Sequence, residues 1–167
     1  MASSPQLISL GLDLSSDEGL TESGLENLVS GVLSKGQKFR SLTLGFSGLK
    51  CLSSAIIGTL FQQLAKHSES LRFLRLNLSN TGVSESDLDH LLSLLSKLDL
   101  EHLELFLGGN SSVNDQFFKR LARHLLSSKL EGVVLDVGYS YCSKKAIKSS
   151  LRDGKEGLKQ LGLYLNG

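Results

Sequence analysis

The chain has 167 residues, of which 40% are hydrophobic and 21% are charged, a composition typical of a globular domain with one continuous core. A net charge of +1, a single Pro, no Trp and no long apolar run give little support to a nucleic-acid-binding protein, a proline-rich linker or a membrane span. The charge is uneven, with −4 over residues 1–36 and +6 over residues 117–159. Solvated helix faces are the simplest interpretation, and a field that orients a polar partner is the alternative.

One phrase recurs along the chain and is plainest from Leu71, where the sequence reads LRFLRLNLSN. Six copies start near residues 7, 39, 71, 100, 130 and 158. Intervals of 28–32 residues are typical of repeat proteins. Within each copy, the apolar positions four, six and eight alternate with other residues, which predicts a strand with one buried face. We predict a single domain over residues 1–167.

Helical spacing follows each of the first five strands, with apolar residues at i, i+3, i+4 and i+7. In the first four repeats these residues are Leu25, Leu28, Val29, Val32 and Leu33, then Ile56, Ile57, Leu60, Phe61, Leu64 and Ala65, then Leu88, Leu91, Leu92 and Leu95, and then Phe117, Phe118, Leu121, Ala122 and Leu125.

Polar residues before each run predict the helix caps. We expect Ser23 and Glu26 to form a capping box in the first helix and Asn114 to cap the fourth. For the second helix the candidates are Ser53 or Ser54, and for the third Ser84 or Ser86.

The last two repeats are weaker. The fifth helix has only Ala146, Ile147 and Leu151 as apolar anchors, and the sixth repeat is a strand alone. The fifth helix also carries a basic patch, made of Lys144, Lys145, Lys148 and Arg152.

The alternation of strand and helix predicts an α/β fold, a right-handed solenoid of about five and a half repeats. A curved parallel sheet would form its concave face and the helices its convex face. The phrase L-x-x-L-x-L and its period resemble the ribonuclease-inhibitor-like class of the leucine-rich-repeat family, which includes the Ran GTPase-activating protein. The resemblance covers residues 7–167. The asparagine of the family's turn remains only as Asn80 and Asn110, which implies less regular turns.

Catalytic and metal-binding motifs are missing from the sequence. The two cysteines and four histidines have no metal-ligand spacing, so we expect no enzyme, no cofactor and no metal site. We expect His67, His90 and His124 to be exposed on helices. Cys51 and Cys142 occupy equivalent positions three strands apart, about 14 Å, which is too far for a disulfide. This favours a reducing compartment.

The concave face is the predicted partner-binding surface. Strand positions three, five and seven point to it, and from the third repeat onward they carry aromatic and charged residues. These are Phe73, Arg75, Asn77, His102, Glu104, Phe106, Asp136 and Tyr164. Such a mixture is typical of protein-binding surfaces. The alternative is that the two phenylalanines pack along the sheet while Arg75 pairs with Glu104.

We therefore predict a non-enzymatic interaction or scaffold module, a small subunit of a larger assembly. It would bind another protein through the concave face, through solenoid ends that carry no recognisable cap, or through both. A homo-oligomer, end-to-end packing and a longer repeat array are alternatives at the ends. The resemblance adds a GTPase regulator similar to the Ran GTPase-activating protein. The basic C-terminal half adds nucleic-acid binding, although no aromatic residues alternate with its lysines.

The first residues, MASSPQ, do not have the composition of a secretion signal. We expect an intracellular, soluble and cytoplasmic protein, with an organelle or a cilium as the alternative compartment. The identity of the partner is left open by the sequence.

Overall fold

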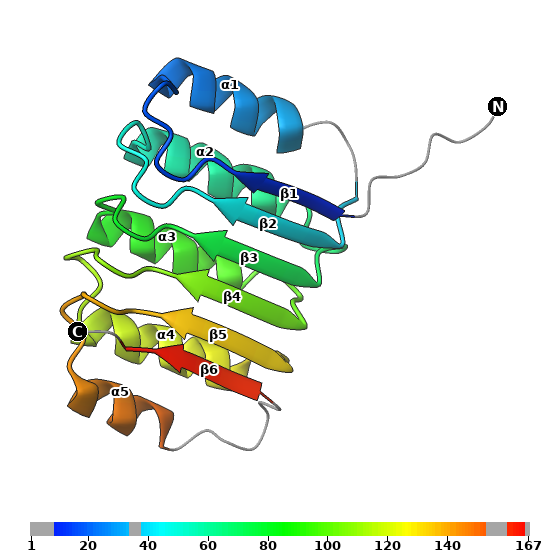
Figure 1. The fold of residues 1–167 in the computed structure, drawn as a ribbon. Helices are drawn as coiled ribbons and strands as arrows, with labels where there is room; N and C mark the ends of the chain where they lie inside the picture. Colours follow the sequence, from blue (N-terminus) through cyan, green and yellow to red (C-terminus); the bar gives the residue numbers. More distant parts are fainter. Residues whose placement is uncertain (1–8, 34–37, 153–159, 166–167) are drawn as a thin grey trace.

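The computed structural model describes residues 9–33, 38–152 and 160–165. Strands and helices alternate strictly along this part of the chain (Figure 1). The strands are β1 (Ser9–Asp13), β2 (Ser41–Gly45), β3 (Phe73–Asn77), β4 (His102–Phe106), β5 (Gly132–Asp136) and β6 (Gln160–Tyr164). The helices are α1 (Glu22–Leu33), α2 (Ser54–Ala65), α3 (Glu85–Leu95), α4 (Asp115–Ser127) and α5 (Lys144–Leu151).

The six strands form one parallel sheet in the order β1 to β6, and each pairs with its neighbours in sequence. The register places equivalent repeat positions side by side, so that Ser41 pairs with Phe73 and Phe73 with His102. The helices lie together behind the sheet in Figure 1. We call the opposite side of the sheet the open face. The α/β class and the parallel sheet predicted from the sequence are confirmed.

The core lies between the sheet and the helices. Columns of equivalent residues fill it, such as Leu42, Leu74 and Leu103 at position four, all of which are buried. Each of the first four helices buries most of the expected stripe. Leu28 and Val32 of α1, Ala65 of α2 and Leu92 of α3 are only half-buried, whereas Leu94 of α3, which was not among the expected residues, is buried. This apolar layer is the main source of folding free energy, at about 25 cal/mol per Å² of apolar surface buried.

The turn after each of the first five strands also repeats. Its tenth repeat position has a positive φ in each of these five copies, between 53° and 70°, at Ser16, Gly48, Asn80, Gly109 and Tyr139. The left-handed conformation has no steric cost for glycine and a low cost for asparagine, but it is strained for a bulky residue. The turn is therefore a second repeating unit, independent of the leucines.

Asn110 organises the turn between β4 and α4. It is fully buried, and its Nδ2 donates to the carbonyls of Leu78 and Leu107 at 2.8 and 2.9 Å. Its Oδ1 accepts from the amides of Thr81 and Gly82. Asn80 does not share this role, because it is exposed and occupies the positive-φ position. The equivalent position in that repeat is Thr81, whose hydroxyl donates to the Leu78 carbonyl. Of the two turn asparagines, Asn110 therefore bonds backbone groups of its own turn and the preceding one, and Asn80 is not in the equivalent position.

The helix caps agree in part with the sequence. Ser84 forms a capping box with Asp87, and Asn114 accepts from the amides of Gln116 and Phe117. The predicted box of Ser23 and Glu26 is wrong, because α1 begins at Glu22 and Thr21 accepts from the amide of Gly24.

Two histidines also differ from the prediction. His67 is buried rather than exposed, because the turn after α2 brings it against the preceding repeat. Its Nε2 lies 3.0 Å from the Leu33 carbonyl, and its ring packs edge-on against Phe39. His90 is exposed and His124 is half-buried. Cys51 and Cys142 are both free thiols, as expected.

The terminal strands are less covered than the central ones. Leu10 and Leu12 of β1 are half-buried, and Leu161 of β6 is 42% exposed. Within the described residues, no helix combines the length and apolarity that crossing a bilayer requires.

Candidate interaction surface on the open face

The structure brings the eight predicted partner-binding residues together on the open face of β3 to β6. The in-phase register places Phe73 beside His102, Arg75 beside Glu104, and Asn77 beside Phe106. Arg75, His102 and Tyr164 are exposed, while the other five are half-buried. The side chains next to them along each strand are core leucines or valines of the opposite side, so the alternation expected from the sequence holds.

Arg75 is the centre of this surface. Its Nη1 lies 3.1 Å from Oε2 of Glu104, and its Cζ lies 4.9 Å from the centroid of the Phe106 ring. Arg75 therefore combines an ion pair with a cation–π contact, and both join β3 to β4. The alternative prediction, in which Arg75 pairs with Glu104 and the aromatic residues pack along the sheet, thus holds for Arg75, Glu104 and Phe106.

A hollow of roughly 430 Å³ lies beside this cluster. It exists because Gly132 and Gly162 leave their strands without side chains there. A Cβ atom at Gly132 would lie only 2.5 Å from Nδ1 of His102, so the imidazole occupies the space over that glycine. The wall of the hollow includes Phe73, His102, Glu104, Val134 and Gln160. An apolar floor with polar groups at the rim is the usual form of a site for a protruding side chain.

The residue at the seventh repeat position, the last of each strand, bonds the turn that follows it in several repeats. Oδ1 of Asn77 accepts from the amide of Ser79, and Oδ1 of Asp136 accepts from the amide of Gly138. Asp13 does the same with Ser15, and hydrogen bonds from the Ser15 side chain and amide lower the pKa of Asp13. Asn77 and Asp136 are thus partly occupied in holding their own turns, which leaves the aromatic residues and Arg75 as the freer contact groups.

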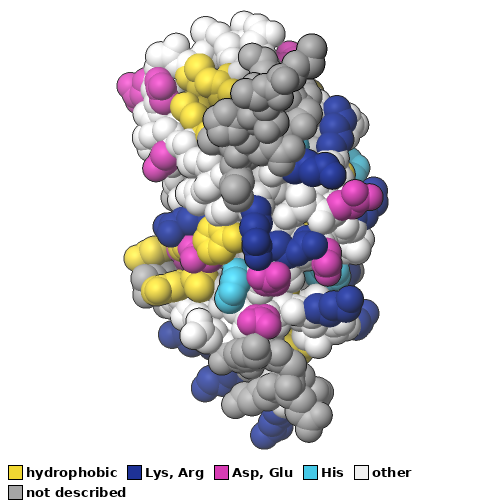
Figure 2. Space-filling model, turned by 90° about the vertical axis from the view of Figure 1, so that its right-hand side faces the viewer, with side chains coloured by type: hydrophobic (Ala, Val, Ile, Leu, Met, Phe, Trp, Pro, Cys, Tyr) yellow, Lys and Arg dark blue, Asp and Glu magenta, His cyan; other side chains and the backbone are white. Residues whose placement is uncertain are grey.

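Charged residues of both signs line the edge at which the strands begin, which Figure 2 shows. Arg72 illustrates the arrangement, because its guanidinium lies 3.6 Å from Asp99 and 3.8 Å from Glu101. It also donates to the carbonyls of Leu71, Glu69 and Asp99. Arg72 therefore stabilises the entry to two strands rather than presenting a free charge.

The residues of the basic patch lie on α5, where Lys144, Lys145, Lys148 and Arg152 are all exposed. Sequence analysis missed two neighbours of this patch. Tyr139 and Tyr141 lie in the turn before α5 and are 79% and 73% exposed, the largest values among the described apolar and aromatic residues. The sequence feature that could have revealed them is that this turn carries tyrosine at two positions where no other turn carries an aromatic residue.

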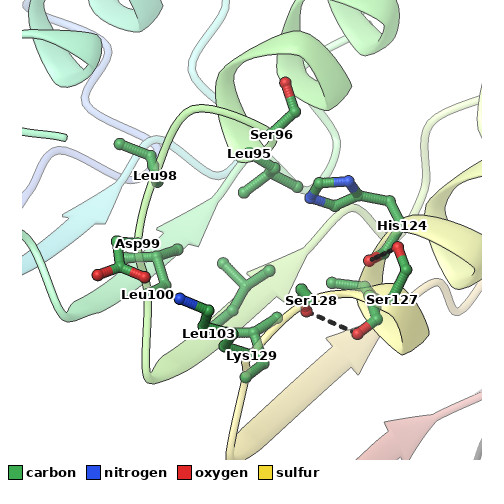
Figure 3. Close-up of a pocket in the computed structure, with 12 residues that line it drawn as sticks. Leu95, Ser96, Leu98, Asp99, Leu100, Leu103, His124, Ser127, Ser128 and Lys129 are labelled. Carbon is green, nitrogen blue, oxygen red and sulfur yellow. Dashed lines mark hydrogen bonds between the residues drawn. The ribbon is translucent and has the colours of Figure 1, made fainter.

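A further pocket of about 250 Å³ opens between the C-terminal ends of α3 and α4 (Figure 3). Leucines form its interior, among them Leu95, Leu98 and Leu103. In Figure 3, the ring of His124 extends from α4 toward Leu95 of α3. None of the groups around the pocket forms a pair of nucleophile and base, and no cluster of metal-ligating side chains occurs within the described ranges.

Comparison with protein-family models gives no match, and no curated protein matches the chain either. The resemblance to leucine-rich repeats therefore depends on the residues and geometry of this chain alone.

Proposed function

We propose that the chain is a leucine-rich-repeat solenoid of the ribonuclease-inhibitor-like class, and that it is a non-enzymatic protein-binding module. Three features support the solenoid: the leucine phrase, the in-phase parallel register of six strands, and the column of positive-φ turn residues. The buried Asn110 supports the family, because it bonds backbone groups of its own turn and of the preceding one.

The observation that carries the binding role is the hollow beside Phe73, Arg75 and Phe106. Helices cover only the other side of the sheet, so these aromatic rings meet solvent unless a partner covers them. A partner side chain inserted into the hollow would contact Phe73 and Val134 at once. Aromatic and arginine residues around a central pocket are typical of binding hot spots.

We propose a small subunit of a larger assembly as the setting for this module. The less covered strands β1 and β6 are consistent with further contacts at the ends. The two free cysteines agree with a reducing, intracellular location, and the cytoplasm is our proposal for it. Regulation of a GTPase remains a prediction that no particular residue of the surface favours.

The first experiment identifies the partner by proximity. A photo-crosslinking amino acid placed at Gln160, on the rim of the hollow, should capture a specific protein from cells. The same amino acid at Ser9 occupies the equivalent position on β1 and is the matched control. Equal capture at the two positions would contradict a binding surface centred on β3 to β6.

The second experiment measures affinity for the purified, identified partner. The double variant Phe73→Ala, Phe106→Ala should bind at least about tenfold more weakly, because truncating hot-spot aromatics costs about 2 kcal/mol or more. Thr43→Ala, on the open face of β2, should bind normally. Unfolding curves of all variants separate loss of contact from loss of fold. Unchanged affinity in the folded double variant would eliminate the open face as the binding site.

A further inference from the structure

The turn between β5 and α5 differs from the other turns of this chain. At the tenth repeat position the other turns carry Ser16, Gly48, Asn80 and Gly109, and at the twelfth they carry Glu18, Lys50, Gly82 and Ser111. The fifth repeat has tyrosine at both positions, and both rings are largely exposed. Because this comparison is made within one chain, it shows which residues the turn itself requires. It requires neither tyrosine.

Tyr139 also has an unfavourable backbone conformation. Its φ of 53° lies in the left-handed region, where an L residue other than glycine or asparagine is strained. The side chain recovers little of this cost by burial, since it is 79% exposed. Strain at an exposed residue is an observation that points toward function.

Cations that form no ion pair with a described residue follow the two tyrosines on α5. Lys144 and Lys145 lie in the first turn of α5, where the helix dipole disfavours positive charge, and Lys148 follows one turn later. On α4, Lys119 lies close enough to Asp115 to lower the pKa of that carboxyl, although hydrogen bonds from Ser143 are the larger cause.

The orientation of α4 extends the same basic surface. Arg120 pairs with Asp89 of α3, so it lies on the flank of α4 toward α3. Lys119 and Arg123 are four residues apart and share a helix face. None of the cations Lys119, Arg123, Lys144, Lys145, Lys148 and Arg152 forms an ion pair with a described residue. Asp115 is an acid close to Lys119, and its oxygens are engaged by Ser143.

We infer that Tyr139, Tyr141 and the lysines of α5 form a binding surface for single-stranded nucleic acid. Two features favour this ligand over an acidic protein. Lysine is depleted at protein interfaces but common at phosphate contacts. The rings of Tyr139 and Tyr141 are also 79% and 73% exposed, so they offer open faces, and stacking of a base requires nothing more. The aromatic residues that the sequence pattern lacked among the lysines are supplied by the preceding turn.

The test uses the whole chain and a fluorescein-labelled twelve-nucleotide oligouridylate. The protein has no Trp and three Tyr, so quenching of intrinsic fluorescence by unlabelled oligouridylate reports stacking directly at two of its three fluorophores. We expect binding with a log–log salt slope of about −0.7 for each phosphate contacted. Tyr139→Ala and Tyr141→Ala should each weaken binding at least about fivefold, because stacking contributes about 1 kcal/mol or more per base. Tyr→Phe at either position should retain binding.

Charge reversal supplies the matched control. Lys144→Glu with Lys148→Glu should abolish binding, whereas Lys66→Glu with Lys97→Glu, an equal change of charge at exposed positions after α2 and α3, should leave it intact. If both pairs weaken binding equally, or if the Tyr→Ala variants bind normally, the attraction is non-specific and the inference is wrong. Equal or tighter binding of a twelve-residue polyglutamate peptide would assign the surface to an acidic protein instead. The open-face variant Phe73→Ala, Phe106→Ala should bind oligouridylate normally, so the two proposals fail separately.

Discussion

The guanidinium of Arg75 lies over the ring of Phe106 at 4.9 Å while it contacts Glu104 at 3.1 Å, so a single side chain joins β3 to β4 across the open face. The other arginine of this region, Arg72, is used differently. Its side chain is less exposed, and it donates to three backbone carbonyls at the entry to the strands.

This contrast predicts unequal effects on stability. Arg75→Ala should lower the free energy of unfolding by about 1 kcal/mol, since an exposed ion pair and an exposed cation–π contact each contribute about 0.5 kcal/mol. Arg72→Ala should lower it by about 2 kcal/mol, because carbonyl groups lose a charged donor. Urea unfolding of both variants measures the difference. A larger loss for Arg75→Ala would mean that the open face is held together by this residue rather than kept available for a partner.

Asn110 should be the most sensitive polar residue of the turns. Asn110→Ala leaves the amides of Thr81 and Gly82 and the carbonyls of Leu78 and Leu107 without their partner in a buried site. We expect a loss of about 2–4 kcal/mol, which corresponds to several unsatisfied buried groups. Asn80→Gly, one repeat earlier at an exposed positive-φ position, is the control and should be nearly neutral. Thermal unfolding that ranks the two variants in the opposite order would contradict the role assigned to Asn110.

Relief of strain at Tyr139 should stabilise the fold. Tyr139→Gly places at this position the residue that Gly48 and Gly109 provide in other repeats, and we expect a gain of about 0.5–1 kcal/mol. The reverse change, Gly48→Ala, should destabilise, because its φ is 67° and the new Cβ would lie 3.0 Å from Oγ of Ser16. Chemical denaturation measures both. A loss of stability in Tyr139→Gly would show that the ring makes a contact that offsets the backbone strain.

The attachment of α5 to α4 should depend on acid pH. Oδ1 of Asp115 accepts from the amide of Ser143 at 2.6 Å, and Oδ2 accepts from its hydroxyl at 2.8 Å, which lowers the pKa of Asp115. Because the folded pKa lies below the unfolded one, the stabilisation is complete above the unfolded value of about 4 and is lost as the pH falls through the folded value. The amide resonance of Ser143, followed by NMR, should shift in that acid range. In Asp115→Asn this titration should vanish, and a shift that persists would assign it to another group.

Much of the fold could be predicted from the sequence because its signals are periodic. The alternation from Leu74 to Leu78 fixed the buried side of β3, and the equal phase of the other repeats fixed the register. Features that depend on a single side-chain contact could not be predicted from the repeat pattern. Thr21 rather than Ser23 caps α1, and His67 is buried because the Leu33 carbonyl of the preceding repeat and the Phe39 ring at the start of its own repeat lie against it.

The two candidate binding surfaces also differ in how well the sequence predicts them. The open-face residues follow from strand alternation, so Phe73 and Phe106 could be placed from the sequence alone. Tyr139 and Tyr141 could not, because no other turn carries an aromatic residue at these positions and their exposure depends on the path of the loop. The hollow depends on Gly132 and Gly162, and glycine in a strand does not by itself indicate a cavity.

The boundary between α3 and α4 has a mechanical consequence. Pockets open at both of its ends, one lined by Leu95 and Leu125 and the other by Leu88 and Phe117, while the sheet continues unbroken past it. Under tension along the array, the helices can separate here before the strands do. The segments β1 to α3 and β4 to β6 would then move as two blocks, with the sheet between β3 and β4 acting as the hinge. Forced unfolding of the array would show two steps rather than one.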